Sequence, residues 1–392
     1  MNHKLKIGFF VDSFYPMVDG VAVVVDNYAR NLLKFAEVYV FAPKSSDRTF
    51  VDNFPYKVIR SQSYHIPLTD YDLSFPIFDI QFQKKMKKIT LDIVHIHSPF
   101  AIGLCGIDYA RRHNIPLIGT LHSQYKQDFF ERTKSKILSE VAIKEIMKRF
   151  NKCDQLFAVS QKVSEVFFEY GASKMPEVIL NATDLCPFSD DDYIEKLKRK
   201  YQISHLEKIL LYVGRLDKIK NLDFLFESLV WLKNSEFLYK MIFVGKGPFE
   251  AGMRKKIELL GLSSQTIFTG KISDRLELSA LYKLADLFLF PSLYDTSSLV
   301  QIEAASQCTP SLFLKQAVTA SMISDGINGY LADDYPSAYG KKIIEIFTNL
   351  NSFSIVKENV FRDLYRTWDE IVIELNQKYM ELYRLKQNNM KH

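Results

Sequence analysis

Strand-like apolar runs and helix-like segments alternate along this chain of 392 residues, and the alternation stops once and then restarts. A series of this kind predicts a parallel β-sheet covered by helices. The first series extends over residues 6–180 and the second over residues 209–290, with a polar, strandless interval at 182–192 between them. The length of the chain also fits about two domains. We therefore predict an α/β protein with two domains and a linker.

The positions of the strands follow from the apolar runs. In the first series we expect strands at 6–11, 37–42, 93–97, 117–120, 156–159 and 178–180, and in the second at 209–213, 241–244, 266–269 and 287–290. Hydrophobic residues make up 47% of the chain, which is ample for two cores. Three consecutive aspartates, Asp190 to Asp192, follow no buried strand, so we interpret them as an exposed linker or a helix start, not as a metal-binding motif.

Composition argues against several classes of protein. No apolar run approaches the 18 residues of a membrane-spanning helix, and the first apolar run is too short for a signal peptide. The four cysteines lie far apart without a CxxC pair, so we expect reduced thiols in a cytoplasmic protein and neither a zinc site nor disulfides. The net charge of +5 does not by itself indicate a nucleic-acid partner.

Several polar residues fall at the carboxyl ends of the first strands, where open parallel sheets bind ligands. Gly20 would let the backbone approach a phosphate without a Cβ in the way, although an ordinary turn is an equally good interpretation. His122 follows a buried strand and would either hydrogen-bond a substrate or serve the structure. We expect His95 and His97 to face opposite sides of their strand, which argues against a metal pair.

The stretch from Pro291 to Glu303 carries the strongest local signal. Ser298 followed by Gln301 has capping-box spacing, so we predict that a helix begins there. A helix N-terminus attracts anionic ligands. Asp295 lies in the loop before this helix and Glu303 lies inside it. Two carboxylates beside an anion-binding helix end fit a ligand with both phosphates and hydroxyls, such as a nucleotide sugar.

Two basic features remain. Arg215 and Lys220 lie in one predicted strand-to-helix loop, where they would grip a phosphate or form a solvated surface. Residues 84–152 carry 14 basic and six acidic side chains, and apolar residues interleave with the lysines of 134–152 at helical spacing. A basic amphipathic helix of this kind binds an anionic membrane surface or packs on the core with a solvated face.

The chain resembles the retaining glycosyltransferases of family four, and the resemblance extends over nearly its whole length. The matching pieces, in order, are Asp19-Gly20, His122, Ser160, Val178-Ile-Leu-Asn181, Gly214-Arg215, Lys220-Asn221, Gly245-Lys-Gly247, Gly270-Lys-Ile272, Tyr282-Lys-Leu-Ala-Asp286 and Asp295-x7-Glu303. Each piece is weak, but their shared order is specific. The resemblance implies a GT-B fold, in which two facing Rossmann-like domains enclose an interdomain cleft. The domains would be 1–182 and 183–362, and a terminal helix within 363–392 would cross back to the first domain.

The resemblance also implies a role for each matching residue. Arg215 and Lys220 would neutralise the donor diphosphate, Asp295 would contact the transferred sugar, and His122 would face the reacting centre. These four are the expected catalytic residues. The remaining expected donor-binding residues are Gly20, Gly270, Lys271, Ile272, Ser297, Ser298, Leu299 and Glu303, with Glu303 accepting hydrogen bonds from the ribose. No metal and no cofactor are expected.

The implied reaction is retaining transfer from a nucleoside diphosphate sugar, with UDP expected, to a glycan or lipid-linked acceptor at the cytoplasmic membrane face. Asp295 stands where the family more often has Glu, and Thr296 to Ser298 replace a glycine-containing loop, which puts the identity of the donor sugar in doubt. A soluble transferase acting on a small or protein acceptor and a non-catalytic nucleotide-sugar-binding partner protein are the alternatives. Nucleic-acid binding has only the basic segment behind it, without an aromatic ladder.

Overall fold

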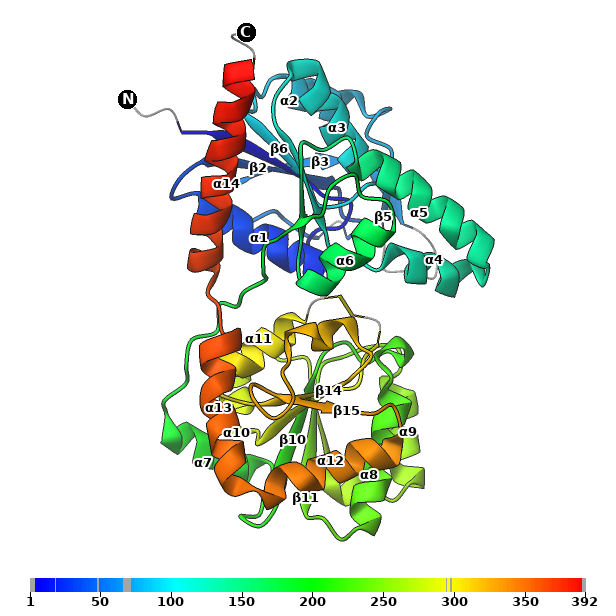
Figure 1. Ribbon diagram of the computed structural model, residues 1–392, viewed down its shortest axis with the longest axis vertical. Helices are drawn as coiled ribbons and strands as arrows, with labels where there is room; N and C mark the ends of the chain where they lie inside the picture. Colours follow the sequence, from blue (N-terminus) through cyan, green and yellow to red (C-terminus); the bar gives the residue numbers. More distant parts are fainter. Residues whose placement is uncertain are drawn as a thin grey trace. The chain divides into compact units, whose positions relative to one another are not determined.

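The computed structural model describes residues 4–17, 19–47, 49–65, 72–293, 295–296 and 298–389. The chain divides into two compact units. Unit 1 contains the residues up to Asn181 together with those from Trp368 onward, and unit 2 contains Ala182–Thr367. Each unit is built around its own parallel sheet (Figure 1). The expected α/β fold with two Rossmann-like domains is therefore confirmed.

Unit 1 contains a seven-stranded parallel sheet in the order β3-β2-β1-β6-β7-β8-β9. Its strands are β1 Lys6–Phe10, β2 Glu37–Pro43, β3 Lys57–Ser61, β6 Ile93–Ile96, β7 Leu117–Leu121, β8 Gln155–Ala158 and β9 Glu177–Val178. Its helices are α1 Gly20–Leu32, α2 Ile80–Lys87, α3 Ala101–His113, α4 Tyr125–Thr133, α5 Lys136–Phe150, α6 Gln161–Glu169 and α14 Trp368–Asn389. A separate hairpin pairs β4 Ser63–His65 with β5 Asp72–Ser74.

Unit 2 contains a six-stranded parallel sheet in the order β12-β11-β10-β13-β14-β15. Its strands are β10 Lys208–Val213, β11 Tyr239–Val244, β12 Thr266–Gly270, β13 Leu287–Phe290, β14 Ser311–Leu314 and β15 Tyr330–Ala332. Its α-helices are α7 Asp191–Lys200, α8 Leu222–Asn234, α9 Glu250–Leu259, α10 Arg275–Leu284, α11 Leu299–Ser306, α12 Pro336–Thr348 and α13 Leu350–Leu364. Three 3₁₀ turns are η1 Lys218–Lys220, η2 Ser263–Gln265 and η3 Val318–Met322.

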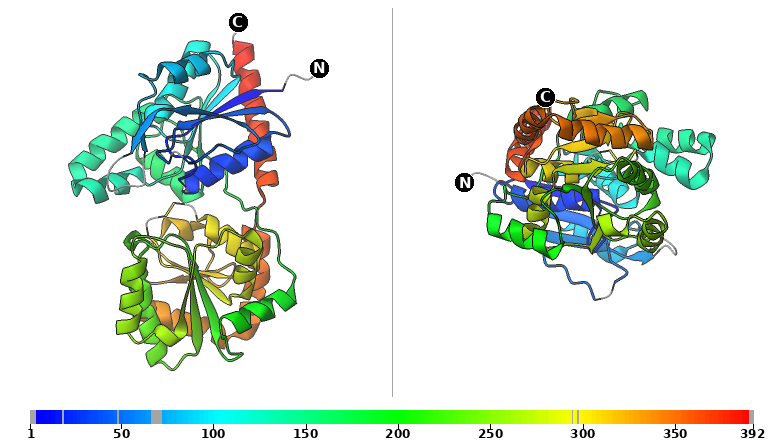
Figure 2. Two further views of the ribbon diagram at one scale, coloured as in Figure 1. Left: turned by 180° about the vertical axis from the view of Figure 1, so that it is seen from behind. Right: turned by 90° about the horizontal axis from the view of Figure 1, so that it is seen from below.

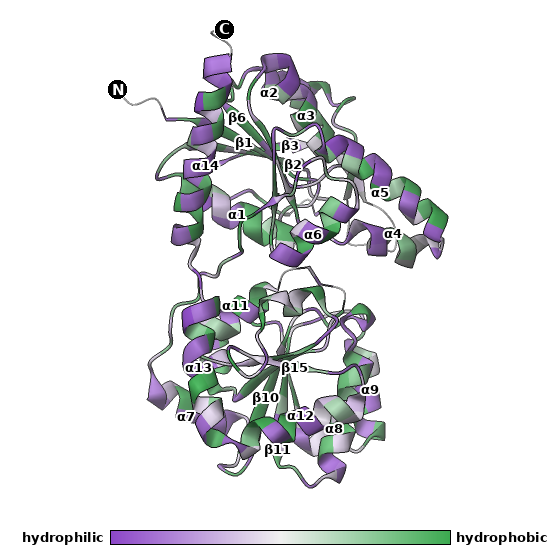
Figure 3. Ribbon diagram, viewed as in Figure 1, coloured by the Kyte–Doolittle hydropathy of each residue, from purple (hydrophilic) through white to green (hydrophobic). Residues whose placement is uncertain are grey.

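All ten expected strands are present, with ends that differ by no more than two residues. The central ones are apolar on both faces, and all four residues of β13 are buried, as a parallel sheet between helix layers requires. Figure 3 shows this as largely hydrophobic strands inside both units. Sequence reasoning predicted none of the other five described strands, which are only three to five residues long: β3, β4, β5, β14 and β15. The Asp190–Asp192 run is confirmed as a helix start, because Asp190 caps α7 by accepting a hydrogen bond from the Tyr193 N–H.

Helix α14 belongs to unit 1 although the chain reaches it from unit 2. It begins at Trp368, after the expected position 363, because α13 continues to Leu364. Its buried residues recur at helical spacing and form one apolar stripe: Trp368, Ile371, Val372, Leu375 and Tyr379. The front view and the view from behind both show α14 beside α1 (Figures 1 and 2).

Polar and aromatic contacts fix α14 along its length. The Trp368 ring meets the Tyr28 ring of α1 edge-on at 5.7 Å between centroids. Lys34 Nζ lies 2.6 Å from Asp369 Oδ1. Near the other end, Lys386 Nζ lies 3.2 Å from Asp154 Oδ1. The helix is thus an integral layer of unit 1.

We predict that Trp368→Ala destabilises unit 1 by about 3–5 kcal/mol, since it removes a buried indole and leaves a cavity against Tyr28. Urea unfolding, monitored by fluorescence and circular dichroism, measures the loss. The matched control is Ile373→Ala on the exposed face of the same helix, which should change stability by less than about 0.5 kcal/mol. Equal stability of the two variants would contradict the docking of α14 through Trp368.

Candidate functional site

The order of the unit 2 sheet reverses between β10 and β13, which are neighbours in space but far apart in sequence. Such a reversal leaves a crevice at the carboxyl ends of the two strands, where open α/β sheets bind ligands. The loop after β10 carries Arg215 and Lys220, and the loop after β13 carries Asp295. Lys220 Nζ lies 2.6 Å from Asp295 Oδ1, and 15% and 21% of these side chains are exposed. The structure therefore brings two of the expected catalytic residues together.

The loops after β10 and β11 are in backbone contact. Gly245 has a φ of +139°, and a Cβ at this position would lie 1.9 Å from the carbonyl oxygen of Gly214. Only glycine fits there. The Gly245 N–H donates to the Gly270 carbonyl at 2.9 Å, which links the end of β12 to the same edge. The ends of four adjacent strands thus meet at one edge of the sheet.

Arg215 is half-exposed, and its Nε lies 3.4 Å from Asp217 Oδ2. Asp217 also caps the short η1 turn that presents Lys220, since it accepts a hydrogen bond from the Ile219 N–H. This turn ends at Asn221, whose side chain donates to the Pro291 carbonyl at 3.2 Å. The loop with the two cations is therefore tied to the end of β13.

Lys271 and Ile272, expected beside the nucleotide base, follow Gly270 at the end of β12. Both line a cavity of about 430 Å³, together with Phe268 and Tyr201 among others. Gly270 has a φ of +75°. This left-handed backbone favours glycine at the point where the chain leaves the sheet.

The helix expected after Pro291 is confirmed as α11. Ser298 caps it by accepting a hydrogen bond from the Gln301 N–H at 3.3 Å, and Leu299 is its first residue. Ser297 lies outside the described residues. The N-terminus of α11 therefore begins at the carboxyl end of β13, as an anion site requires.

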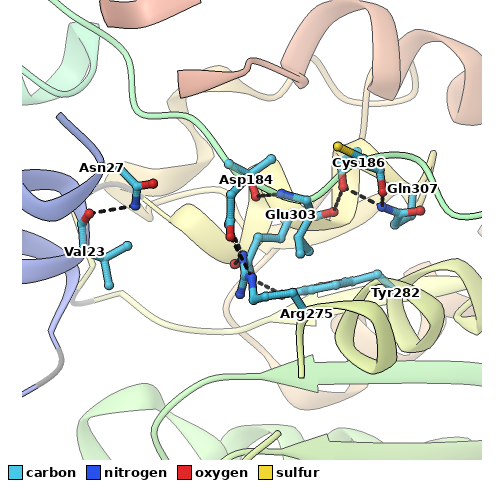
Figure 4. Close-up of polar contacts among 11 residues, drawn as sticks. Val23, Asn27, Asp184, Cys186, Arg275, Tyr282, Glu303 and Gln307 are labelled. Atoms are coloured by element: carbon cyan, nitrogen blue, oxygen red, sulfur yellow. Dashed lines mark hydrogen bonds and ion pairs between the residues drawn. The ribbon is translucent and has the colours of Figure 1, made fainter. Parts of the chain in front are cut away.

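Glu303 is buried in α11, and both of its carboxylate oxygens are engaged (Figure 4). Arg275 Nη2 donates to Oε1 at 3.0 Å, and the Tyr282 hydroxyl donates to Oε2 at 2.9 Å. Arg275 also forms an ion pair with Asp184. Burial raises the pKa of Glu303, while the Arg275 charge and the two hydrogen bonds oppose that rise.

Sequence reasoning assigned no role to Arg275, Tyr282 or Asp184. These residues lie 28, 21 and 119 positions from Glu303 in the sequence and come near it only in the folded unit. The segment that carries Asp184 is held in place by Gln307, whose side chain donates to the Cys186 carbonyl at 2.8 Å (Figure 4). No sequence pattern predicts contacts between segments that are this far apart along the chain.

In unit 1 the sheet order reverses between β1 and β6. Asp12 follows β1, and its carboxylate accepts hydrogen bonds from the Ser98 hydroxyl at 2.6 Å and the Ile102 N–H at 2.7 Å. Gly20 is the first residue of α1, which Asp19 caps. A Cβ added at Gly20 would meet nothing within 4 Å, so the space beside this backbone is open. That space is compatible with the expected approach of a phosphate.

His122 belongs to a buried cluster with His95 and His97. His97 Nδ1 lies 2.9 Å from His122 Nε2, and the His95 ring bridges Tyr379 Oη at 2.6 Å and Thr120 Oγ1 at 2.7 Å. The expectation that His95 and His97 face opposite sides is wrong, because their ring centroids are only 4.2 Å apart. Side chains two positions apart along a strand point to the same face.

Burial lowers the pKa of each of the three imidazoles, and that of His122 falls to about 3. Within the described ranges, no group of three or more His, Cys, Asp or Glu side chains is arranged to hold a metal ion. Within the same ranges, no helix has the length and apolar content needed to cross a membrane.

We predict that acid destabilises unit 1 through these histidines. The pKa values of these three histidines are lower in the folded chain than the unfolded value of about 6.5. Just below pH 6.5 these side chains therefore take up protons in the unfolded chain and not in the folded one. The free energy of unfolding therefore falls as the pH falls through this window. Between about pH 6 and pH 5, His95→Phe should reduce the slope of stability against pH by about 1 kcal/mol per pH unit.

Urea unfolding at several pH values measures these slopes. His205→Asn is the control, because this side chain is exposed and its loss should leave the slope unchanged. Identical slopes for wild type and His95→Phe would contradict the buried neutral state of His95.

Comparison with known proteins gives consistent results. The model for "Glycosyltransferase Family 4" matches residues 18–185, and the model for "Glycosyl transferases group 1" matches residues 193–361. The alpha-monoglucosyldiacylglycerol synthase of Acholeplasma laidlawii is 28% identical over 339 residues, which cover 83% of this chain and 84% of that protein. The protein of the same name from Streptococcus pneumoniae is 26% identical over 334 residues, with 83% and 75% covered.

The structural comparison concerns the fold. Alr3699/HepE of Anabaena, solved in complex with UDP and glucose, superposes with a TM-score of 0.76 at 18% identity. The superposition covers 95% of this chain and 99% of the Anabaena protein. At this identity the likeness shows a shared architecture only.

Proposed function

This chain belongs to the family-four, group 1 glycosyltransferases, and we propose that it moves a hexose from a UDP-sugar to a lipid-linked or glycan acceptor with retention of configuration. The observation that carries the donor assignment is the Lys220–Asp295 pair at the switch point of unit 2. A cation and a carboxylate in contact, beside a helix N-terminus, match a ligand that joins phosphates to sugar hydroxyls. UDP is supported by the Anabaena neighbour, which was solved with UDP and glucose.

In the proposed complex, Lys220 and Arg215 neutralise the diphosphate, and the N-terminus of α11 faces it. Asp295, already held by Lys220, contacts hydroxyls of the transferred sugar. As the bond to the sugar breaks, negative charge grows on the departing diphosphate. Preplaced cations stabilise that charge without reorganisation, and losing one such donor typically costs about 3 kcal/mol of barrier. We propose that these groups serve in place of a divalent metal.

Glu303 is proposed to accept hydrogen bonds from the ribose. Each carboxylate oxygen has two lone-pair sites, so the bonds from Arg275 and Tyr282 leave acceptor capacity on both oxygens. Arg275 and Tyr282 then act as positioning residues that fix the orientation of this carboxylate. Lys271 and Ile272 border the base beside the cavity that they line. Gly20 and His122, which belong to unit 1, are proposed donor residues on the family resemblance alone.

The acceptor is proposed to be membrane-borne. Both curated relatives described above are named for the synthesis of a glucosyldiacylglycerol. In this chain, the N-terminal half of α5 exposes three large apolar side chains: Ile137 at 77%, Leu138 at 55% and Val141 at 60%. The alternative, packing against the core, applies to the side of α5 that carries Ile143, Ile146 and Phe150, which are buried.

Exposed lysines lie on α5 or just before it, together with the exposed Glu140 and Glu145: Lys134, Lys136, Lys144 and Lys148. An apolar patch with a basic rim is the surface that an anionic bilayer attracts, since the apolar side chains insert and the lysines face lipid headgroups. We therefore propose that α5 places the protein on the membrane that carries its acceptor.

The donor site is tested by thermal shift and by release of nucleoside diphosphate, with UDP-, GDP- and ADP-sugars and with EDTA present. We expect one UDP-sugar to raise Tm and to be turned over slowly. Lys220→Ala should lower turnover at least tenfold, because the leaving diphosphate loses a cation. Lys218→Ala, an exposed cation on the same turn, is the matched control and should keep wild-type turnover.

Each outcome of this screen has a clear meaning. Stabilisation by a GDP- or ADP-sugar alone would contradict the choice of UDP. Turnover that requires a divalent metal would contradict the metal-independent mechanism. A shift without turnover would favour the non-catalytic binding protein over the transferase, and no shift with any donor would contradict the proposed donor site.

Membrane contact is tested by flotation with vesicles that contain phosphatidylglycerol. We predict that the double variant Leu138→Glu and Val141→Glu weakens vesicle binding at least tenfold, because each buried aliphatic side chain contributes about 1.5–3 kcal/mol. Leu259→Glu in α9, which replaces a side chain of 77% exposure, is the control and should float like wild type. If the double variant floats normally and still glycosylates lipid acceptors, docking through α5 is wrong.

A further inference from the structure

The guanidinium of Arg275 is shared between two carboxylates of unit 2. Its Nε donates to Asp184 Oδ2 at 3.0 Å, and its Nη2 donates both to Asp184 Oδ1 and, at 3.0 Å, to Glu303 Oε1 (Figure 4). Asp184 therefore takes the Nε/Nη2 edge of the guanidinium as a two-bond fork, whereas Glu303 receives one N–H. The position of Asp184 thus determines how much of the guanidinium reaches Glu303.

The acceptor capacity of Glu303 depends on this division. A carboxylate offers about four lone-pair sites, and the bonds from Arg275 and Tyr282 occupy one on each oxygen. Two sites remain, which matches the two hydroxyls of a ribose. Part of the Glu303 side chain, 12%, is exposed, which gives a ligand access to it.

Removal of the Asp184 carboxylate would change this arrangement. The guanidinium of Arg275 would then be free to turn a fork of two N–H groups onto both oxygens of Glu303, which is the stronger way for arginine to bind a carboxylate. Together with the bond from Tyr282, that fork would leave one lone-pair site on Glu303. One ribose hydroxyl would lose its acceptor.

The backbone around Asp184 is held by contacts that do not involve the Asp184 side chain. Leu185 is buried in the core of unit 2. The side chain of Gln307 donates to the Cys186 carbonyl and accepts from the Phe188 N–H, both at 2.8 Å. The ion pair that Asp184 forms is itself about half-exposed, and such pairs add little to stability. Loss of this carboxylate is therefore expected to leave unit 2 folded.

We propose that Asp184 is a positioning residue for the donor nucleotide, and that it holds the Arg275 guanidinium aside so that Glu303 keeps two acceptor sites open toward the ribose. The negative charge of Asp184 acts in the same direction, because it offsets a cation that would otherwise be paired with Glu303 alone. This role rests on the proposed ribose contact of Glu303, whereas Asp184 acts only through Arg275.

The test compares UDP with 2′,3′-dideoxy-UDP, which lacks both ribose hydroxyls. Isothermal titration calorimetry measures the two dissociation constants in wild type and in Asp184→Ala. We expect wild type to prefer UDP by about tenfold or more, and Asp184→Ala to reduce this preference by about fivefold, because one hydrogen bond to a charged acceptor is lost. Affinity for the dideoxy compound should change by less than about twofold.

Glu195→Ala is the matched control, since it removes a carboxylate from an exposed ion pair with Lys198 in α7. It should keep the wild-type preference. Asp184→Asn keeps the shape of the side chain but offers one neutral acceptor, so it should reduce the preference in the same direction. It serves as the test if Asp184→Ala does not fold by circular dichroism.

A double variant shows whether Asp184 acts through Arg275. In Arg275→Leu no guanidinium remains to be held, so the addition of Asp184→Ala should change the preference by less than about twofold. In turnover assays, Asp184→Ala should raise KM for the donor and leave kcat within about twofold, because the ribose is bound alike in the substrate complex and in the transition state.

The outcomes separate the role of Asp184 from the proposed function. A wild-type preference for UDP that persists in Asp184→Ala, whether or not both nucleotides bind more weakly, would overturn the role of Asp184 alone. Equal affinity of wild type for the two nucleotides would overturn the ribose contact of Glu303 and the role of Asp184 with it. If wild type bound neither nucleotide, the assignment of UDP as donor nucleotide would be overturned as well.

Discussion

The reversal of strand order in each parallel sheet is the constraint on which the rest of the structure depends. At a reversal, the connections that follow two neighbouring strands run in opposite directions and leave a crevice at the carboxyl ends of these strands. Side chains that are distant in sequence meet at this crevice. In unit 2 this brings Lys220 to Asp295 across 75 positions, and in unit 1 it brings Asp12 to Ser98 across 86 positions. Neither pair has any local reason to form.

The partly buried carboxylate of Asp12 follows β1 in unit 1, the buried carboxylate of Glu303 lies in α11 of unit 2, and each is satisfied in a different way. Asp12 is held by a hydroxyl and by the backbone N–H groups at the start of α3. Glu303 is held by a guanidinium and a phenol. Taking such groups out of water is costly unless they are fully paired, and the pairing fixes their orientation. A carboxylate fixed before the ligand arrives needs no rearrangement to receive it.

Much of the fold was predictable because its signals are local. The apolar run of β13 and the spacing of Ser298 and Gln301 each determine structure within a few residues. The contacts around Glu303 were not predictable, because Arg275 and Asp184 come from other segments and no pattern links them. The wrong prediction that His95 and His97 face opposite sides was avoidable, because side chains two positions apart along a strand point to the same face. The site assignments from family resemblance remain predictions, although the structure does bring Lys220 and Asp295 together.

Helix α5 shows a second limit of sequence patterns. Its apolar residues looked equivalent along the sequence, yet Ile146 and Phe150 are buried while Ile137, Leu138 and Val141 are exposed. Helical spacing predicts which residues share one face of a helix. It does not predict how much of that face the rest of the unit covers.

The membership of α14 in unit 1 has a consequence for the order of events during synthesis. Translation produces all of unit 2 before the residues from Trp368 onward emerge from the ribosome. Until then His95 lacks the Tyr379 hydroxyl and Tyr28 lacks its indole neighbour. The unit that is begun first is therefore completed last, and a nascent chain must keep an unfinished core soluble while its second unit folds.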